Sequence, residues 1–146
     1  MRRRKDRLAV IAGLVGFLFA VAAVSVWAQA GPTLKIASPK PGEKIAGDTV
    51  VIQWESAGAK IVAAADAKQK EEAHFHLFLN RSDFKLGAEI PRDMEAEGIY
   101  HTAKSSFELK GLKPGRHYVF VVLSYNNHVP WDPFVYDVVM FETGAR

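Results

Sequence analysis

The sequence predicts an all-β domain, a two-layer β-sandwich, preceded by a separate N-terminal helical segment. Two observations lead to this prediction. Residues 1–30 are first basic and then apolar, whereas residues 31–146 alternate short runs of β-branched and aromatic residues with turns rich in glycine and proline. The length of the second part suits one domain built around one hydrophobic core. The chain therefore divides at residue 30.

The N-terminal segment has the three parts of a secretory signal. Four arginines and a lysine lie within residues 2–7, residues 8–28 carry no charge, and Ala-Gln-Ala at 28–30 is a small-x-small cleavage site. The uncharged stretch is also long enough to cross a bilayer as a helix. We therefore expect residues 1–30 to be a signal peptide or a membrane anchor. The domain would be periplasmic or secreted, and it would contact a membrane only through residues 8–28 if the segment stays uncleaved.

The basic character of the chain belongs to this leader. Of 19 lysines and arginines, five lie within residues 2–7, and beyond residue 30 fourteen basic residues stand against fifteen acidic ones, a net charge of −1. Nucleic-acid-binding domains are usually strongly basic, so nucleic acid is excluded as a partner. The sequence has no cysteine, so disulfides and thiolate metal or redox sites are excluded as well.

Six strands are expected in the domain, joined by a loop and one long polar connection. The strands are 34–37, 49–54, 73–80, 105–110, 117–125 and 134–142, the loop is 57–72, and the connection is 81–104, with at most one short strand. Side chains alternate between the two faces of a strand. In the strand 73–80, Phe75 and Leu77 therefore share one face, and His74 and His76 share the other.

The strongest local pattern is Leu112-x-Pro114-Gly115-x-x-Tyr118. It resembles the tyrosine corner of immunoglobulin and fibronectin III sandwiches, in which a tyrosine early in the sixth strand bonds back to the backbone of the preceding turn. The fold class expected is therefore an immunoglobulin/fibronectin III-like β-sandwich. The corner also requires the tyrosine to point into the core, together with every second residue after it, Phe120 and Val122.

This orientation leaves an apolar outer face on the sheet made by strands 73–80, 117–125 and 134–142, the C–F–G sheet of such sandwiches. The residues of the middle strand expected on that face are Val119, Val121 and Leu123. A monomer seldom exposes a surface of this kind. We expect the connection 81–104 to fold back over it, and the alternatives are a second copy of the chain, as a homodimer, or a protein partner.

All five histidines lie between residues 74 and 128. In the assumed topology, His74 and His76 begin one strand, His101 shortly precedes another, and His128 lies in the last loop, so that these four meet at one end of the sandwich. His117 begins its strand at the opposite end. The sequence therefore predicts one histidine cluster of four members.

Such a cluster has the chemistry of a metal site. Residues two apart on a strand share a face, so His74 and His76 can reach one ion, and imidazole suits Cu(II), Zn, Ni or Fe. We predict a divalent metal, copper(II) or zinc, bound by His74, His76, His101 and His128, with Asp132 or a water completing the coordination. The alternative is that these histidines are exposed at a polar loop end and bind no metal.

Several motifs, taken in order, resemble an uncharacterised family of exported bacterial immunoglobulin-like proteins, known only as a domain of unknown function. They are Ser38-Pro39-x-x-Gly42, His74-x-His76-Leu77, His101, Leu112-x-Pro114-Gly115-x-His117 and His128-x-Pro130-x-x-Pro133. The resemblance implies a periplasmic or secreted location and an immunoglobulin-like fold, and it implies no activity. Where the family pattern leads us to expect an acidic residue after the histidine-rich strand, this chain has Asn80-Arg81-Ser82-Asp83.

No catalytic motif accompanies the histidines in the sequence. A Gly-x-Ser-x-Gly elbow, a His-Glu-x-x-His helix and a phosphate-binding glycine loop are all absent. We therefore expect a binding protein rather than an enzyme, and the first hypothesis is an exported metal-binding protein. Its alternative is a non-metal module that meets a protein or polymer through the last loop or the outer face. A metal-dependent enzyme is the third hypothesis.

Overall fold

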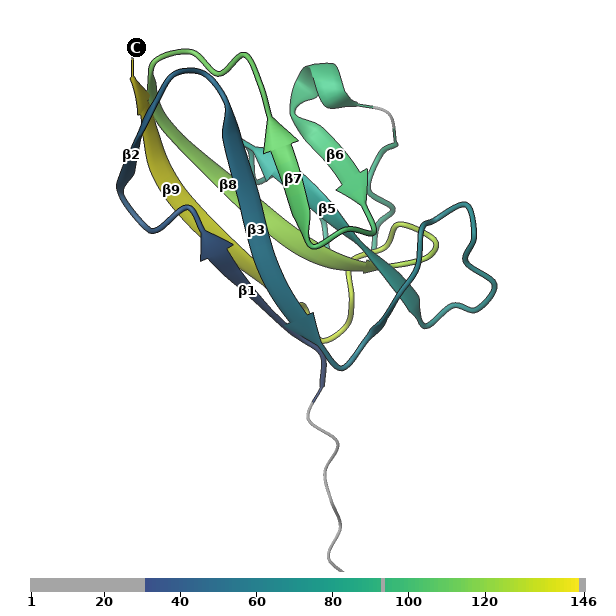
Figure 1. Cartoon of the computed structure of the whole chain (residues 1–146). Coiled ribbons are helices and arrows are strands. Elements are labelled where there is room, and N and C mark those ends of the chain that lie inside the picture. Colours follow the sequence, from purple (N-terminus) through teal and green to yellow (C-terminus); the bar gives the residue numbers. More distant parts are fainter. Residues whose placement is uncertain (1–30, 93, 145–146) are drawn as a thin grey trace, which may run out of the picture.

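Figure 1 shows a computed structural model of the chain, which describes residues 31–92 and 94–144. The segment 1–30 lies outside the described residues, so the signal peptide or anchor stays a prediction. Within the described ranges, no helix is long and apolar enough to cross a membrane.

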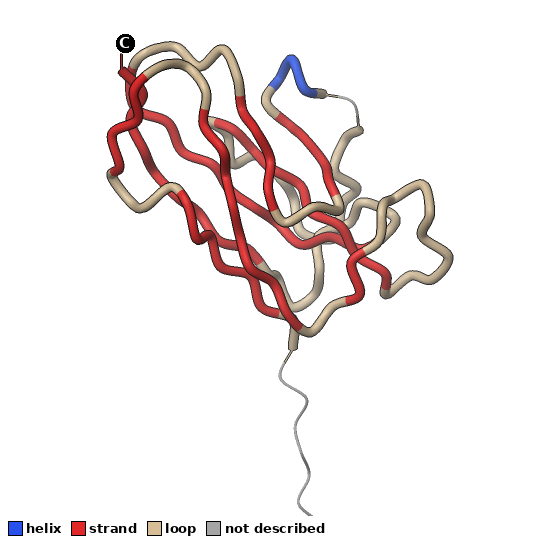
Figure 2. The backbone as a smooth tube through the Cα atoms, in the orientation of Figure 1, coloured by secondary structure: helices blue, strands red, loops and turns tan. Residues whose placement is uncertain are grey.

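Two β-sheets pack face to face and form the sandwich (Figures 1 and 2). One sheet has the order β1 (Thr33–Ser38), β3 (Val50–Ala57) and β7 (Ser106–Leu109). The other has the order β2 (Glu43–Ala46), β9 (Tyr136–Gly144), β8 (Gly115–Tyr125), β5 (Glu72–Leu79) and β4 (Lys60–Ile61), and β6 (Ile99–Thr102) also pairs with β5. A short 3-10 turn, η1 (Glu95–Glu97), precedes β6. This is the immunoglobulin/fibronectin III-like β-sandwich that the sequence predicts.

The six expected strands are all present, as β1, β3, β5, β7, β8 and β9, and the connection 81–104 holds one short strand, β6. Two further strands, β2 and β4, are not predicted by the sequence pattern. Both are short, of four and two residues, and both pair in parallel with a longer strand, β9 or β5. They exist because a neighbouring strand offers hydrogen bonds, and a local pattern does not show this.

The main core lies between the two sheets and follows the alternation of β3 and β5. Ile52 and Trp54 of β3 are buried, and they face Phe75 and Leu77 of β5. The indole of Trp54 meets the ring of Phe75 edge to face, with centroids 5.2 Å apart. The expected division of the 73–80 strand is confirmed, because His74 and His76 lie on the other side of the sheet.

The strand β8 presents to the core the face opposite to the one predicted. Val119, Val121 and Leu123 are fully buried in the main core, with 0% exposure. Phe120 and Val122 pack in a second apolar cluster on the outer face. The prediction that Phe120 and Val122 point into the core is therefore wrong. The strand is shifted by one residue relative to the expected tyrosine corner.

His117, rather than Tyr118, makes the corner bond. Its Nε2 donates to the carbonyl of Lys113 at 2.8 Å, four residues upstream, and its Nδ1 accepts from Asn80 Nδ2 at 2.9 Å. A tyrosine corner bonds back to the same turn in the same way. Because the bonding side chain sits one position earlier, every following residue of β8 changes face, and this explains the reversed orientation.

We expect His117→Phe to cost about 1–3 kcal/mol of unfolding free energy, because it keeps a ring but leaves buried polar groups with fewer partners. Tyr118→Phe should stay within about 0.5 kcal/mol of the wild type, as substitutions away from such features do. Urea unfolding measures both. A larger loss of unfolding free energy for Tyr118→Phe than for His117→Phe would indicate that Tyr118 makes the corner bond.

The connection 81–104 folds back over part of the outer face, as expected. Phe84 and Ile90 of this connection pack against Phe78 of β5 and Val122 of β8. The connection 81–104 does not cover the outer face of β9. Three apolar side chains of that strand remain exposed: Tyr136 (46%), Val138 (40%) and Met140 (62%).

Candidate metal centre

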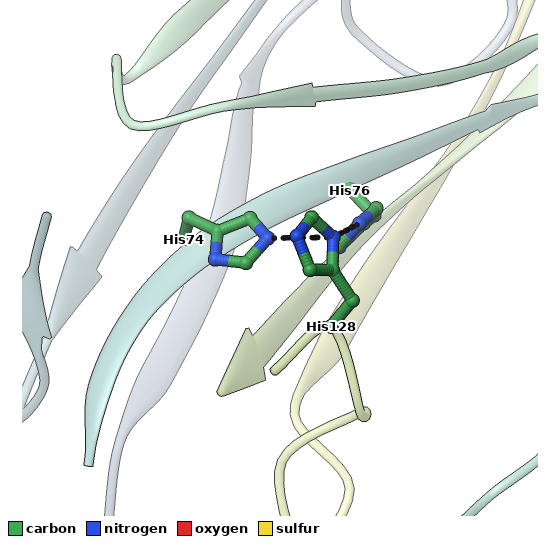
Figure 3. Close-up of side chains that lie close together, drawn as sticks. All are labelled: His74, His76 and His128. Carbon is green, nitrogen blue, oxygen red and sulfur yellow. Dashed lines mark hydrogen bonds between the residues drawn. The ribbon is translucent and has the colours of Figure 1, made fainter. Parts of the chain in front are cut away.

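Three buried histidines meet on the outer face of the β5-containing sheet (Figure 3). His74 and His76 project from β5, with 1% and 0% exposure, and His128 reaches them from the β8–β9 loop, with 2% exposure. The backbone of His128 is left-handed, with φ of 63°. Its N–H donates to the carbonyl of Tyr125 at 2.9 Å, and its carbonyl accepts from the N–H of Ile90 at 2.8 Å. These bonds hold the loop so that the third imidazole points at the strand.

The spacing of the three imidazoles suits a single metal ion. His128 Nδ1 lies 3.0 Å from His76 Nε2 and 3.3 Å from His74 Nε2. One ligand atom from each residue lies within 4.8 Å of the other two. Two nitrogens bound to a tetrahedral zinc ion at about 2.0–2.1 Å are about 3.3 Å apart. Both contacts of His128 Nδ1 are therefore close to the separation that coordination would impose.

Ser124 orients one of these imidazoles. Its hydroxyl lies 3.1 Å from His76 Nδ1, and the side chain is fully buried on β8 directly across from His74. Metal-binding histidines usually hydrogen-bond through their second ring nitrogen, which sets the ring orientation. Ser124 thus leaves His76 Nε2 directed at the other two rings. Ser124 was not among the predicted site residues, because the orientation expected for β8 turns its side chain toward the core.

Burial keeps the imidazoles in the neutral form that binds metals. Desolvation, reinforced by the neighbouring imidazoles, lowers the pKa of His74 to about 4 and that of His76 to about 2. A protonated imidazole has no lone pair to offer, so metal binding requires deprotonated histidine. At neutral pH both side chains are therefore ready to act as ligands.

The fourth predicted member, His101, stands beside the buried three but is itself exposed. It lies on β6, directly across from His76. Its ring centroid is 6.1 Å from that of His74, 6.0 Å from that of His76 and 5.6 Å from that of His128. The structure thus brings all four predicted histidines together. They meet on a sheet face beneath a loop rather than among loop tips.

The converging ligand atoms of the described residues are imidazole nitrogens only. Asp83, in the segment where an acidic residue was expected, pairs with Arg81 instead. The buried carboxylate of Glu72 accepts from Lys60 Nζ at 2.7 Å and from the N–H of Gln69 at 3.0 Å, so it anchors the loop before β5. Asp132 is exposed in the β8–β9 loop and is not part of the converging group.

No family model matches this chain, and no curated protein matches it. Among solved structures, the chain is similar to the fibronectin(III)-like modules of Clostridium thermocellum CbhA, with 13% identity and a TM-score of 0.47 over 79% of this chain and 47% of that chain. The chain thus spans about half the length of that structure. It is also similar to the PKD domain of human KIAA0319, with 15% identity and a TM-score of 0.39 over 83% of this chain and 89% of that one. Similarity at this level assigns no function.

Proposed function

We propose that this protein is an exported binding protein that holds one divalent metal ion, copper(II) or zinc, between His74, His76 and His128. The observation that carries the proposal is the convergence of three buried imidazoles within 4.8 Å. Binding rather than catalysis is proposed, because no catalytic motif accompanies the histidines in the sequence.

The hydrogen bonding of the cluster favours a ligand over mere packing. Buried polar groups normally have hydrogen-bond partners of their own. His128 Nδ1 faces two imidazole nitrogens although it carries only one lone pair or one proton. An ion in this space would replace both contacts by coordinate bonds. Without an ion, these two contacts cannot both be full hydrogen bonds of the one nitrogen.

The donor set favours copper(II) or zinc over copper(I). Copper(I) prefers thiolate and thioether ligands, whereas imidazole suits copper(II) and zinc. The sequence has no cysteine. Met140 is exposed across from Tyr118, at the far end of β8 from Ser124, and Met94 packs with the apolar cluster around Phe78.

A metal titration of the unfolding temperature tests the proposal. The protein is stripped with a chelator and then titrated with Zn(II), Cu(II) and Ni(II). A ligand that binds only the folded state stabilises it by about 4 kcal/mol at a thousand times its Kd. We expect a saturable rise with zinc or copper(II), and His76→Ala should abolish it.

His117→Phe is the matched control, because it removes a histidine outside the cluster. This variant starts from a lower unfolding temperature but should show the same rise with metal. If no ion shifts the unfolding temperature of the wild type, the proposal fails. If His76→Ala keeps the full rise, the ion binds elsewhere.

Export is part of the proposal and is supported by the leader-like residues 1–30. We expect the protein to be found in the periplasm or the medium of a bacterial host. N-terminal sequencing should show a start at Gly31 if the signal is cleaved. An intact N-terminus in the membrane fraction would instead indicate the anchor.

The exposed stripe on β9, formed by Tyr136, Val138 and Met140, favours one second candidate, an interaction module without metal. Exposed apolar patches often mark protein contacts. If this hypothesis holds, the chain self-associates in sedimentation, and Met140→Asp makes it monomeric. A monomeric wild type at high concentration would argue against the homodimer.

A further inference from the structure

We infer that His101 is a relay ligand, through which the metal ion enters and leaves the buried three-histidine site. This inference rests on the proposed function and concerns how that site exchanges its ion. The observation behind it is the contrast between one exposed imidazole and three buried ones within a single cluster.

Ring distances separate His101 from the other three. A ring centroid lies about 3 Å from a metal that the ring binds, so two ligand rings on a tetrahedral ion have centroids about 5 Å apart. The buried rings meet this value, with 4.7 Å between His74 and His76, 4.6 Å between His74 and His128, and 5.1 Å between His76 and His128. His101 is 5.6–6.1 Å from each of them. It therefore stands outside the coordination distance by roughly one ångström, and it is nearly equidistant from all three.

The strand that carries His101 leaves this side chain room to move. β6 has four residues and pairs only with β5, so it is an edge of the sheet. His101 is exposed, and exposed side chains change rotamer on the picosecond to nanosecond timescale. The relay requires only a rotation of this ring, outward toward solvent and inward toward the other three histidines.

The burial of the other three ligands explains why a relay is needed. Each of His74, His76 and His128 is at most 2% exposed, so a fully hydrated ion does not reach their nitrogens. Exposed His101 can replace one water of the hydrated ion by its lone pair at the surface. The ion then moves inward as the buried imidazoles replace further waters, one water leaving for each nitrogen bound. Each exchange replaces one metal-bound water by one imidazole nitrogen, and no electron is transferred.

Three roles of His101 can be distinguished by kinetics. A relay speeds both entry and exit, so its removal slows both and leaves Kd nearly unchanged. An ordinary fourth ligand holds the ion, so its removal speeds release and weakens binding without changing association. A simple cover blocks access, so its removal speeds both steps.

Stopped-flow measurements on the wild type and His101→Ala decide between them. The probe is zinc sulfate or copper(II) sulfate, whichever the equilibrium titration shows to bind, and release is followed after addition of excess EDTA. We expect association and release both to slow by about tenfold or more, with Kd changed by less than about threefold. Circular dichroism and the metal-free unfolding temperature should match the wild type, because the side chain is exposed. His117→Phe, which alters a histidine outside the cluster, should keep wild-type rates.

Unchanged association with weaker binding, or faster steps in both directions, would overturn the relay. These outcomes leave the proposed function intact as long as the wild type binds and His76→Ala does not. Absence of binding to the wild type would overturn the proposed function and the relay together.

Discussion

Acidification of the metal-free protein should destabilise it steeply between about pH 6 and pH 4, as expected for buried histidines that stay neutral. The folded protein holds the pKa of His74 at about 4 and that of His76 at about 2, against an ordinary value of 6.5. As the pH falls below 6.5, the unfolded chain takes up protons at these two positions and the folded protein does not. Each such histidine lowers the unfolding free energy by about 1.4 kcal/mol per pH unit, so the pair contributes about 3 kcal/mol per unit. Near pH 4, His74 becomes protonated in the folded state and its contribution to the slope ends.

Urea unfolding at intervals between pH 7 and pH 4 measures this slope. The control is the double variant His74→Phe/His76→Leu, which exchanges two buried polar rings for apolar side chains. It leaves buried Ser124 and His128 with fewer partners, so we expect it to lose about 1–3 kcal/mol of unfolding free energy at pH 7. Between pH 6 and pH 5 its unfolding free energy should fall less steeply than that of the wild type, by about 3 kcal/mol per pH unit. Glu72 contributes little to the pH dependence of the unfolding free energy between pH 6 and pH 5. Its pKa is lowered to about 2, chiefly by the hydrogen bond from Lys60, so the stability it adds is lost only below its ordinary value of 4.5. An equal slope in the double variant would show that the histidines are not the cause.

Val119→Asp should prevent folding, whereas Val138→Asp should be tolerated. Val119 is fully buried in the main core, so a carboxylate there would lie in an apolar interior without a partner. Burying an unpaired charge belongs to the few mechanisms that cost more than about 4 kcal/mol, and total stabilities are only about 5–15 kcal/mol. Val138, on β9 across from Phe120, is 40% exposed and would keep the new carboxylate in water.

The two variants introduce the same change into neighbouring strands, so the comparison isolates the face of the sheet. Soluble yield and circular dichroism of both proteins measure the result. A folded Val119→Asp together with an unfolded Val138→Asp would mean that the corner residue is Tyr118 after all. It would also turn Ser124 away from His76 and weaken the case for an ordered metal site.

The face of β5 follows from the sequence, because the alternation of apolar and polar residues there is unambiguous. In β5, Phe75 and Leu77 alternate with His74 and His76, so only one orientation buries the apolar side chains between the sheets. The pairing of these two histidines on one face, and hence half of the candidate site, could therefore be predicted. Four of the five histidines were also expected to gather, and they do.

The orientation of β8 could not be predicted in the same way. Residues 118–123 are apolar at every position, so a period of two leaves both faces equivalent, and the corner motif alone decided the prediction. The structure chooses His117 because its two ring nitrogens find partners on separate segments, the Lys113 carbonyl and the Asn80 amide. A motif that contains both His117 and Tyr118 does not say which of them bonds back.

The sequence by itself determined the all-β class, the main strands and the histidine pair on β5. Only the tertiary structure decided the face of β8, the position of Ser124, the inward turn of His128 and the separate place of exposed His101. The physical reason is the range of the forces involved. Alternation of apolar and polar residues acts locally along one strand, whereas the loop of His128 and the register of β8 depend on hydrogen bonds between residues far apart in the chain, such as Ile90 with His128. Those bonds form only when the strands and loops have come together.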